Sequence, residues 1–495
     1  MLTQSKLIII YIGCFLGVVL QLSCKKLVSI PPPKNTLTTV QVFSSLSQAE
    51  SAMAGIYTRM INGENNSAPP LAGTNVWSAG ALRLLAGLSS GELYNSGGPL
   101  QANYYAFSSN KLTAINNSST ALIIWKGAYI TIYGANSIIE GVAASTSLRE
   151  DDRKRLTGEA KFLRAFAYFY LTNLFGDVPL ALTVDFHKTV NLPRAPQAEV
   201  YKLIIDDLKE AQTSMSPEYT TSLGERIRPN KWAATALLAR AYLFTEDYDN
   251  AVINATALIN EQGLYQLETD LNTTFKSNSL EAIWQLKPGG TSSILKNATP
   301  EGQISLPSPR YTGYADFYLS GHLMGAFEPG DKRRVDWVDS TIYTGGSGSA
   351  NFYPTKYQIG QSNSAFGQPG EYYMMLRLAE IFLIRAEAIA RGNQGNLSTA
   401  IDDLNAIRHR AGLEHLPNTL NKEQVIAAVE QERQVELFAE WGHRWLDLKR
   451  TNRASVVLKT IPVKLPWEGD YQLLYPIPVE EIRDDYFLTQ NPGYF

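Results

Sequence analysis

The chain has 495 residues, of which 44% are hydrophobic and 18% charged, and its formal net charge is −3. This length and composition are sufficient for a large core in one or two domains. The small net charge and the lack of a basic run argue against a nucleic-acid-binding protein. Aromatic residues are abundant, with 26 Tyr and 8 Trp, which suits a large core and also surfaces that stack on sugar rings.

The N-terminus predicts a targeting segment. Lys6 precedes an apolar run over residues 7–20, which is short for a membrane-spanning helix. The run ends at Ser23-Cys24, and a small residue before such a cysteine resembles a bacterial lipoprotein cleavage site. We expect residues 1–23 to be the signal peptide, Cys24 to carry the lipid anchor, and residues 24–45 to form an extended tether with three consecutive prolines. An ordinary secretory signal with an incidental cysteine is the alternative.

Cysteine usage agrees with a lipid-anchored chain. The only other cysteine, Cys14, lies inside the predicted signal peptide. The mature chain would then contain no disulfide and no cysteine-based metal site or nucleophile. Its stability would depend on the hydrophobic core alone.

Helical periodicity recurs along the rest of the chain. Apolar residues at helical spacing predict helices at about residues 48–60, 120–142, 156–176, 197–213 and 421–450. The stretch 230–259 predicts a helical hairpin, because Ala239, Tyr242, Tyr248 and Ala251 have tetratricopeptide spacing. The stretch 371–413 predicts a second hairpin around a Gly-Asn-Gln-Gly turn. Since one hairpin cannot bury its apolar face alone, we expect a mainly α, tetratricopeptide-like scaffold in a single domain over residues 46–495.

The helix over residues 371–391 predicts a buried ion pair. Arg385 lies away from the polar face of this helix and should therefore point into packed surface. A buried arginine without a partner would be very costly, so we expect a carboxylate beside it. The acidic row on the helix over residues 421–450 offers Glu432, Glu436 and Glu440.

Two long regions, 63–117 and 265–370, interrupt the helical pattern and are rich in Gly, Ser and Pro. We expect them to be irregular insertions that converge on one face of the scaffold and form a shallow site. Sugar rings stack on the faces of Trp and Tyr side chains. The candidates for ligand contact are Trp77, Tyr94, Tyr104, Tyr311, Tyr314 and Trp337.

No catalytic constellation, metal site or cofactor motif is evident in the sequence, so we expect a protein that is not an enzyme. The five histidines include no His-Glu-x-x-His pair, and no Gly-x-Ser-x-Gly elbow occurs. His409 and His415 as a metal pair, and residues 246–249 as a calcium loop, are incomplete patterns, and local structural roles are favoured. The acidic row lies along one helix, whereas a glycosidase places two carboxylates across a cleft.

Five segments together carry a resemblance to a known family. They are FLRAFAYFYLTNLFGDVPL (162–180), LRLAEIFLIRAEAIAR (376–391), DLNAIRHRAGL (403–413), ERQVELFAEWGHRWLDLKR (432–450) and LLYPIPVEEIRDDYFLTQNPGY (473–494). In this order they resemble the SusD/RagB family of outer-membrane nutrient-binding lipoproteins of Bacteroidetes.

The resemblance has implications for fold, ligand, partner and location. It implies four tetratricopeptide-like hairpins with loops that bind a glycan or other nutrient, and a SusC-like TonB-dependent transporter as partner. It also implies a lipid-anchored protein of the cell outer membrane that faces the exterior. A tetratricopeptide scaffold lipoprotein that binds a protein or peptide is the alternative, but such a scaffold has no need of long aromatic insertions.

Overall fold

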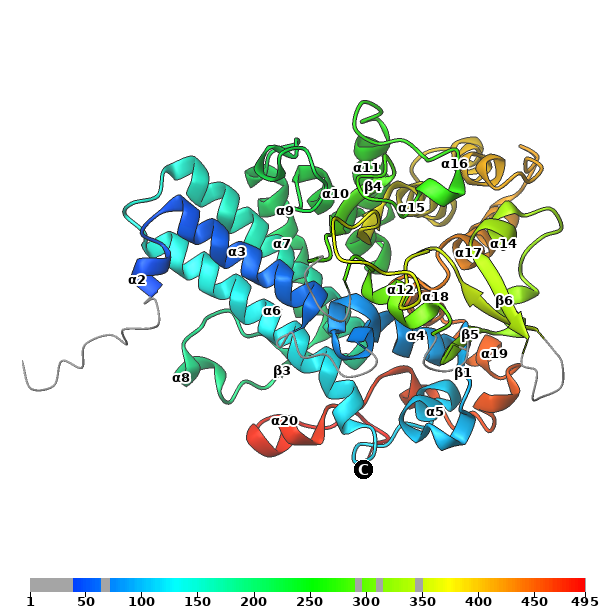
Figure 1. Ribbon diagram of the computed structural model, residues 1–495, viewed down its shortest axis with the longest axis horizontal. Helices are drawn as coiled ribbons and strands as arrows, with labels where there is room; N and C mark the ends of the chain where they lie inside the picture. The colour runs from blue at the N-terminus through cyan, green and yellow to red at the C-terminus, as the bar shows by residue number, and fades with distance from the viewer. Residues whose placement is uncertain (1–38, 64–71, 290–295, 309–314, 343–349, 495) are drawn as a thin grey trace, which may run out of the picture.

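Helices dominate the computed structural model, which describes residues 39–63, 72–289, 296–308, 315–342 and 350–494 (Figure 1). The longer helices are α3 (Leu46–Asn62), α6 (Ser118–Ala144), α7 (Glu150–Phe175), α9 (Gln197–Ser214), α10 (Lys231–Phe244), α11 (Tyr248–Ile259), α15 (Leu378–Arg391), α16 (Leu397–Arg410), α17 (Lys422–Glu436) and α18 (His443–Arg450). In these ranges no helix has both the length and the apolarity needed to cross a membrane.

These helices pack in succession as antiparallel neighbours. Helix α3 lies on α6, and the series continues through α7, α9, α10 and α11 to α15, which packs on both α16 and α17. The hairpin α10–α11 is closely packed because Ala239 and Ala251 are fully buried at its crossing. The Asn230 and Asp247 side chains cap the two helices by accepting backbone N–H groups. The tetratricopeptide-like scaffold is therefore confirmed.

Helix α7 supplies the aromatic centre of the core. Phe166 lies edge-on to Trp284 and Trp441, with ring centroids 5.2 and 5.1 Å away. Trp284 belongs to β4 and Trp441 to the segment between α17 and α18. The predicted helix at residues 156–176 thus joins the N-terminal helices, the second insertion and the C-terminal helices in one core.

The first insertion is more regular than its composition predicts. It contains η2 (Ala72–Asn75), the π-helical turn η3 (Trp77–Ala81), α4 (Leu82–Ser90), β1 (Leu93–Asn95) and α5 (Ala102–Ser109). Every residue of α4 is buried. The expectation of an irregular region was therefore wrong here, because a short buried helix lies within this Gly-, Ser- and Asn-rich stretch.

The second insertion also contains regular elements. Its strands are β4 (Ala282–Leu286), β5 (Phe317–Leu319), β6 (Val338–Ile342) and β7 (Ala350–Pro354), and its helices are α12 (Pro300–Ser305), α13 (Gly321–Met324) and α14 (Lys332–Asp336). Strand β4 pairs with β8 (Tyr373–Arg377), which leads directly into α15. The expectation of a wholly irregular stretch was therefore wrong for this region too.

The two insertions meet in one antiparallel sheet of order β1-β5-β7-β6. Strand β1 comes from the first insertion and the other three strands from the second, and Tyr94 stands opposite Tyr318 in the register of β1 and β5. The predicted convergence of the two insertions is confirmed. The convergence matters for function because it brings aromatic side chains from distant parts of the chain together.

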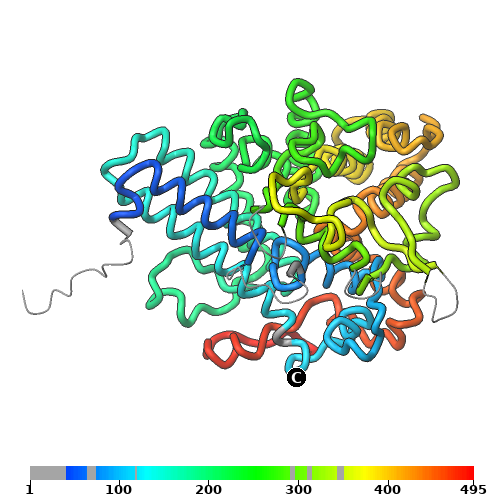
Figure 2. The backbone as a smooth tube through the Cα atoms, in the orientation of Figure 1, coloured from blue at the N-terminus to red at the C-terminus, as the bar shows by residue number. Residues whose placement is uncertain are grey.

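The C-terminal segment returns across the body of the molecule (Figure 2). After α19 (Ala454–Leu458), the Tyr475 N–H donates to the Leu174 carbonyl at 2.8 Å, and α20 (Val479–Asp484) then lies beside α6. The remaining short elements are α2 (Thr39–Val42), α8 (Phe186–Thr189), β2 (Val178–Pro179) and β3 (Arg194–Ala195).

The predicted helix over residues 421–450 is broken between α17 and α18, so the expectation of one long helix was wrong. Ala439, Trp441 and Gly442 have φ angles of 52°, 46° and 68°, which end the helix and restart it. The break places the Trp441 indole in the core, where its Nε1–H donates to the Met374 carbonyl at 2.8 Å.

Arg385 has the expected carboxylate partner, but not from the predicted acidic row. Its Nε and Nη2 donate to Oδ2 and Oδ1 of Asp403 at 2.8 and 2.6 Å. Asp403 lies on α16, the second helix of the same hairpin. The acidic row is occupied instead by other cations, so the prediction was right about the kind of partner and wrong about its identity.

Candidate functional site

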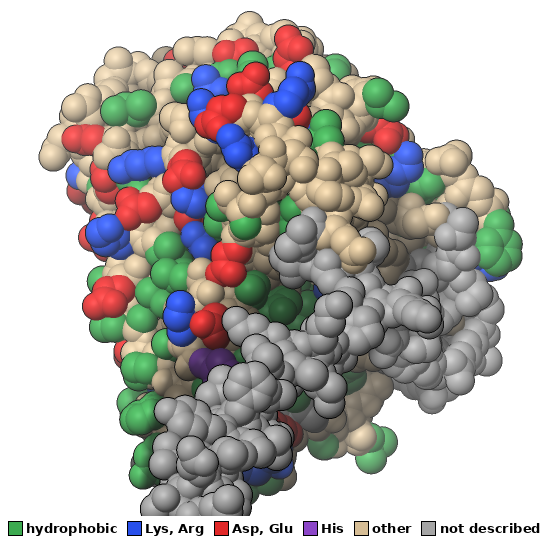
Figure 3. Space-filling model, turned by 90° about the vertical axis from the view of Figure 1, so that its left-hand side faces the viewer, with side chains coloured by type: hydrophobic (Ala, Val, Ile, Leu, Met, Phe, Trp, Pro, Cys, Tyr) green, Lys and Arg blue, Asp and Glu red, His purple; other side chains and the backbone are tan. Residues whose placement is uncertain are grey.

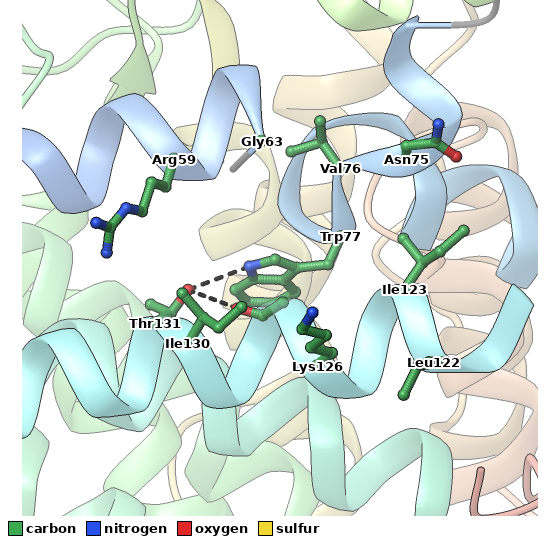
Figure 4. Close-up of a pocket in the computed structure, with 11 residues that line it drawn as sticks. Arg59, Gly63, Asn75, Val76, Trp77, Leu122, Ile123, Lys126, Ile130 and Thr131 are labelled. Atoms are coloured by element: carbon green, nitrogen blue, oxygen red, sulfur yellow. Dashed lines mark hydrogen bonds between the residues drawn. The ribbon is translucent and has the colours of Figure 1, made fainter. Parts of the chain in front are cut away.

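A small cavity lies where the first insertion leaves the helical scaffold (Figure 4). Its volume is about 220 Å³, and it is enclosed by the C-terminal end of α3, by η2 and η3, and by one face of α6. The lining residues are Arg59, Gly63, Asn75, Val76, Trp77, Leu122, Ile123, Lys126, Gly127, Ile130 and Thr131. The cavity thus combines an apolar floor with two basic side chains.

Trp77 forms the floor of this cavity. Its Nε1–H donates to Thr131 Oγ1 at 3.2 Å, and its ring packs against Phe166 and Tyr170. Gly127 permits this contact, because a Cβ there would lie 2.6 Å from Cδ1 of Trp77. The indole is almost wholly buried, so Trp77 offers a ligand an edge of its ring and no exposed stacking face.

The sheet that joins the two insertions carries a second group of aromatic side chains. Tyr94 is half-buried, its ring lies 5.8 Å from that of Tyr318, and its hydroxyl donates to Asn351 Oδ1 at 2.8 Å. Tyr104 is also half-buried and packs edge-on against Phe317 at 5.0 Å. Burial raises the pKa of both tyrosines, so both hydroxyls are neutral and can donate hydrogen bonds at neutral pH.

Trp337 is a core residue, and its prediction as a ligand contact was wrong. Its side chain is 1% exposed, and its Nε1–H donates to the Leu271 carbonyl at 3.0 Å. The Lys356 ammonium lies 4.6 Å from the ring centroid and satisfies one face of the indole. The composition of an insertion does not distinguish a packed aromatic ring from an exposed one.

Three of the predicted functional residues lie outside the described ranges: Tyr311, Tyr314 and the anchor Cys24. Their roles stay predictions. Sequence reasoning also missed Arg59 and Lys126, which line the Trp77 cavity. Each is a single basic residue on the polar side of a helix, and no local pattern distinguishes it from an ordinary surface residue.

Surface charge gives no sign of a strongly charged ligand at the end of the molecule that carries α3 and α6. Basic and acidic side chains are interspersed over this face (Figure 3). The rings of His409 and His415 lie 5.7 Å apart, but in the described part of the chain no group of three or more His, Cys, Asp or Glu residues could hold a metal ion.

Comparison with solved structures defines the class of protein. A SusD superfamily protein from Bacteroides vulgatus has a TM-score of 0.74 at 21% identity, over 91% of this chain and 100% of its own. A laminarin-binding SusD-like protein has a TM-score of 0.72 at 23% identity, over 90% and 99% of the two chains. The chain therefore shares the fold of these SusD-like structures, a tetratricopeptide-like helical scaffold that carries insertions.

Sequence comparison then gives the family. Residues 93–243 match a family described as "Starch-binding associating with outer membrane", and residues 344–494 match one described as "SusD family". SusD-like protein P2 of Formosa agariphila is 27% identical over 442 residues, which are 78% of this chain and 83% of the relative. The starch-binding protein SusD of Bacteroides thetaiotaomicron is 23% identical over 435 residues, 72% and 74% of the two chains.

The chain belongs to the SusD/RagB family. This is a family of non-catalytic proteins associated with the outer membrane, and the chain is not an enzyme.

Proposed function

We propose that the protein binds a glycan where its two insertions meet and delivers it to a SusC-like TonB-dependent transporter. The observation that carries this proposal is the pairing of β1 with β5, beside which Tyr94 and Tyr104 contact residues more than 210 positions away in the sequence. Binding sites commonly take aromatic and polar side chains from several loop segments that a rigid scaffold holds together.

The relatives support a glycan as the ligand class. One solved SusD-like protein is described as laminarin-binding, and the curated SusD of Bacteroides thetaiotaomicron as starch-binding. These two glucose polymers differ in linkage, so the shared scaffold does not determine the polymer. The choice of glycan therefore depends on the insertions of each protein, here residues 63–117 and 265–370.

We expect weak binding that depends on ring stacking. The Trp77 cavity, at about 220 Å³, is smaller than the roughly 300–1,000 Å³ of most ligand pockets and would hold one sugar ring. The rest of the ligand would contact the exposed parts of the half-buried Tyr94 and Tyr104, with Tyr311 and Tyr314 as further candidates. Such a site corresponds to a Kd on the order of micromolar to millimolar, or about −4 to −8 kcal/mol.

The anchor and the transporter complete the proposal. Ser23-Cys24 at the end of an apolar run supports lipid attachment at Cys24, on the outer membrane and facing the cell exterior. Cys24→Ala should release the protein from the membrane fraction. If the variant still sediments with outer membrane after a carbonate wash, the anchor is assigned incorrectly.

Affinity purification from the native cell should recover a large TonB-dependent barrel with the protein.

The ligand class is tested by titration calorimetry of the mature chain with starch-type and laminarin-type oligosaccharides. We expect at least one series to bind in the stated range and to be recovered intact. Release of new reducing ends by the purified protein would contradict the proposal. Absence of binding to every neutral oligosaccharide, while a peptide library binds, would favour a protein-binding scaffold instead.

A further inference from the structure

A larger cavity lies on a different face of α6. Its volume is about 480 Å³, and it is enclosed by α6, by the segment 179–192 that contains α8, and by α20 (Figure 1). From α6 it takes Trp125, Tyr129 and Tyr133, whereas the Trp77 cavity takes Lys126 and Ile130. These sets lie on adjoining strips of the helix surface, and the two cavities are distinct because they share no lining residue.

Aromatic side chains form the wall and the mouth of this cavity. Trp125 and Tyr129 lie deep, with ring centroids 5.1 Å apart, and their polar atoms donate to Glu481 Oε2 at 3.1 Å and to the Pro179 carbonyl at 2.8 Å. Tyr133 and Phe186 stand at the mouth and are 59% and 66% exposed. The inner rings are therefore fixed by hydrogen bonds, while the outer rings present free faces.

The charged groups that line the cavity are all carboxylates. They are Glu481, Asp484 and Asp485, and the described lining includes no Lys, Arg or His. Asp484 Oδ1 accepts from Arg483 Nε and Asp485 Oδ1 from the Phe487 N–H, both at 2.9 Å. Burial raises the pKa of Glu481, and its acidic neighbours add to this effect although Lys126 opposes it. A positive charge in the cavity would offset the free-energy cost of burying the ionised Glu481 carboxylate.

We propose that this cavity is a second binding site, which takes an organic cation, specifically an amino-sugar unit with a free ammonium group. Aromatic faces attract ammonium groups, and the carboxylates add charge-assisted hydrogen bonds. The volume falls within the range of ligand pockets. Anions are disfavoured by the carboxylates, and neutral sugars gain only stacking. None of these residues belongs to the glycan site proposed above, so this inference stands independently of it.

The test compares two ligands with the same sugar backbone, one with ammonium groups and one in which these groups are acetylated and neutral. The mature chain is titrated at pH 6 with the β-1,4 trisaccharide of glucosamine and with its fully N-acetylated counterpart. We expect the ammonium form to bind at least about fivefold more tightly. Equal affinity for the two trisaccharides, or no binding of either, would overturn the proposal.

Substitutions in the cavity test whether the ammonium form binds there. Tyr133→Ala and the double variant Asp484→Asn/Asp485→Asn should each raise the Kd of the ammonium form about threefold or more. Tyr133→Phe, which keeps the ring, and Asp206→Asn, an exposed carboxylate on α9, should leave it unchanged. Undiminished binding by the first two variants would contradict the assignment. Binding could also be lost in the Asp484→Asn/Asp485→Asn variant but kept in Tyr133→Ala, with calcium displacing the trisaccharide. That result would show a simple cation site and would also contradict the assignment.

Discussion

Arg377 and Glu436 form an ion pair in the centre of the molecule, with Nη1 2.6 Å from Oε1 and side chains 2% and 0% exposed. The same guanidinium also contacts Glu281 at 2.7 Å and Glu440 at 2.8 Å. Arg377 ends β8, Glu281 precedes β4, and the other two acids belong to α17 and the break that follows it. These buried charges therefore join the second insertion to the C-terminal helices.

Removal of Arg377 should destabilise the protein strongly. Arg377→Met removes one of the cations that the buried Glu281, Glu436 and Glu440 share, which costs about 3–5 kcal/mol. Urea unfolding followed by circular dichroism measures this loss. The matched control is Arg149→Met, because Arg149 is exposed where it pairs with Asp152 and its loss should have a much smaller effect. Equal losses in the two variants would contradict a structural role for the buried network.

Lys464 is expected to hold three segments together. Its buried ammonium donates to the carbonyls of Leu88, Ser89 and Ser108 at 3.0, 2.8 and 2.9 Å. Lys464→Met keeps the chain length but leaves these carbonyls without a donor, so we expect a loss of about 2–4 kcal/mol. Thermal unfolding checks the prediction. An unchanged melting temperature would mean that water replaces the ammonium at no cost.

His443 should make the protein less stable in mild acid. Burial lowers its pKa to about 4, and the nearby Glu380 carboxylate does not offset this effect. In the unfolded chain a histidine has a pKa of about 6.5, so below this pH the unfolded state binds more protons. The contribution of the neutral His443 to the free energy of unfolding is complete above pH 6.5. It is lost as the pH falls toward 4, by about 3 kcal/mol in total.

The His443→Gln variant isolates this titration from that of the many buried carboxyl groups. The difference in unfolding free energy between wild type and variant should be constant above pH 7 and should shift in favour of the variant between pH 6.5 and 4. A difference that does not vary with pH would show that the imidazole titrates alike in both states.

Trp337 and Tyr94 should respond differently to truncation. Trp337→Ala removes a fully packed indole and its hydrogen bond to Leu271, so we expect a loss of about 3–5 kcal/mol in stability. Tyr94→Ala removes a half-buried ring at the edge of the sheet and should lower stability far less. Chemical unfolding of the two variants side by side distinguishes a core residue from a surface residue.

The scaffold could be predicted because its signals are local. The alanines of α10 and α11 and the aromatic stripe of α7 have helical spacing, and caps such as Asn230 mark where helices begin. Helix α4 was missed because it is only nine residues long and lies within a stretch rich in Gly, Ser and Asn. The strands β1 and β5 are three residues long and are defined only by their pairing with distant segments.

Side-chain environments depended on contacts that the sequence does not encode locally. Arg385 pairs with Asp403 on the neighbouring helix, whereas the acidic row meets Arg377, Arg408 and Lys356. The break at Trp441 depends on a positive φ that carries no local signature for this residue type. The prediction of Trp337 as a ligand contact was wrong for the same reason, since only tertiary packing buries its ring.

The most direct test of the account is the affinity of the Tyr94→Ala/Tyr104→Ala variant for the oligosaccharide that binds wild type best. Each truncation should cost at least about 1 kcal/mol, so the double variant should bind roughly 25-fold or more weakly while remaining folded. Calorimetry gives both Kd values under identical conditions. Undiminished binding by the folded double variant would contradict the central claim that the two insertions build one glycan site.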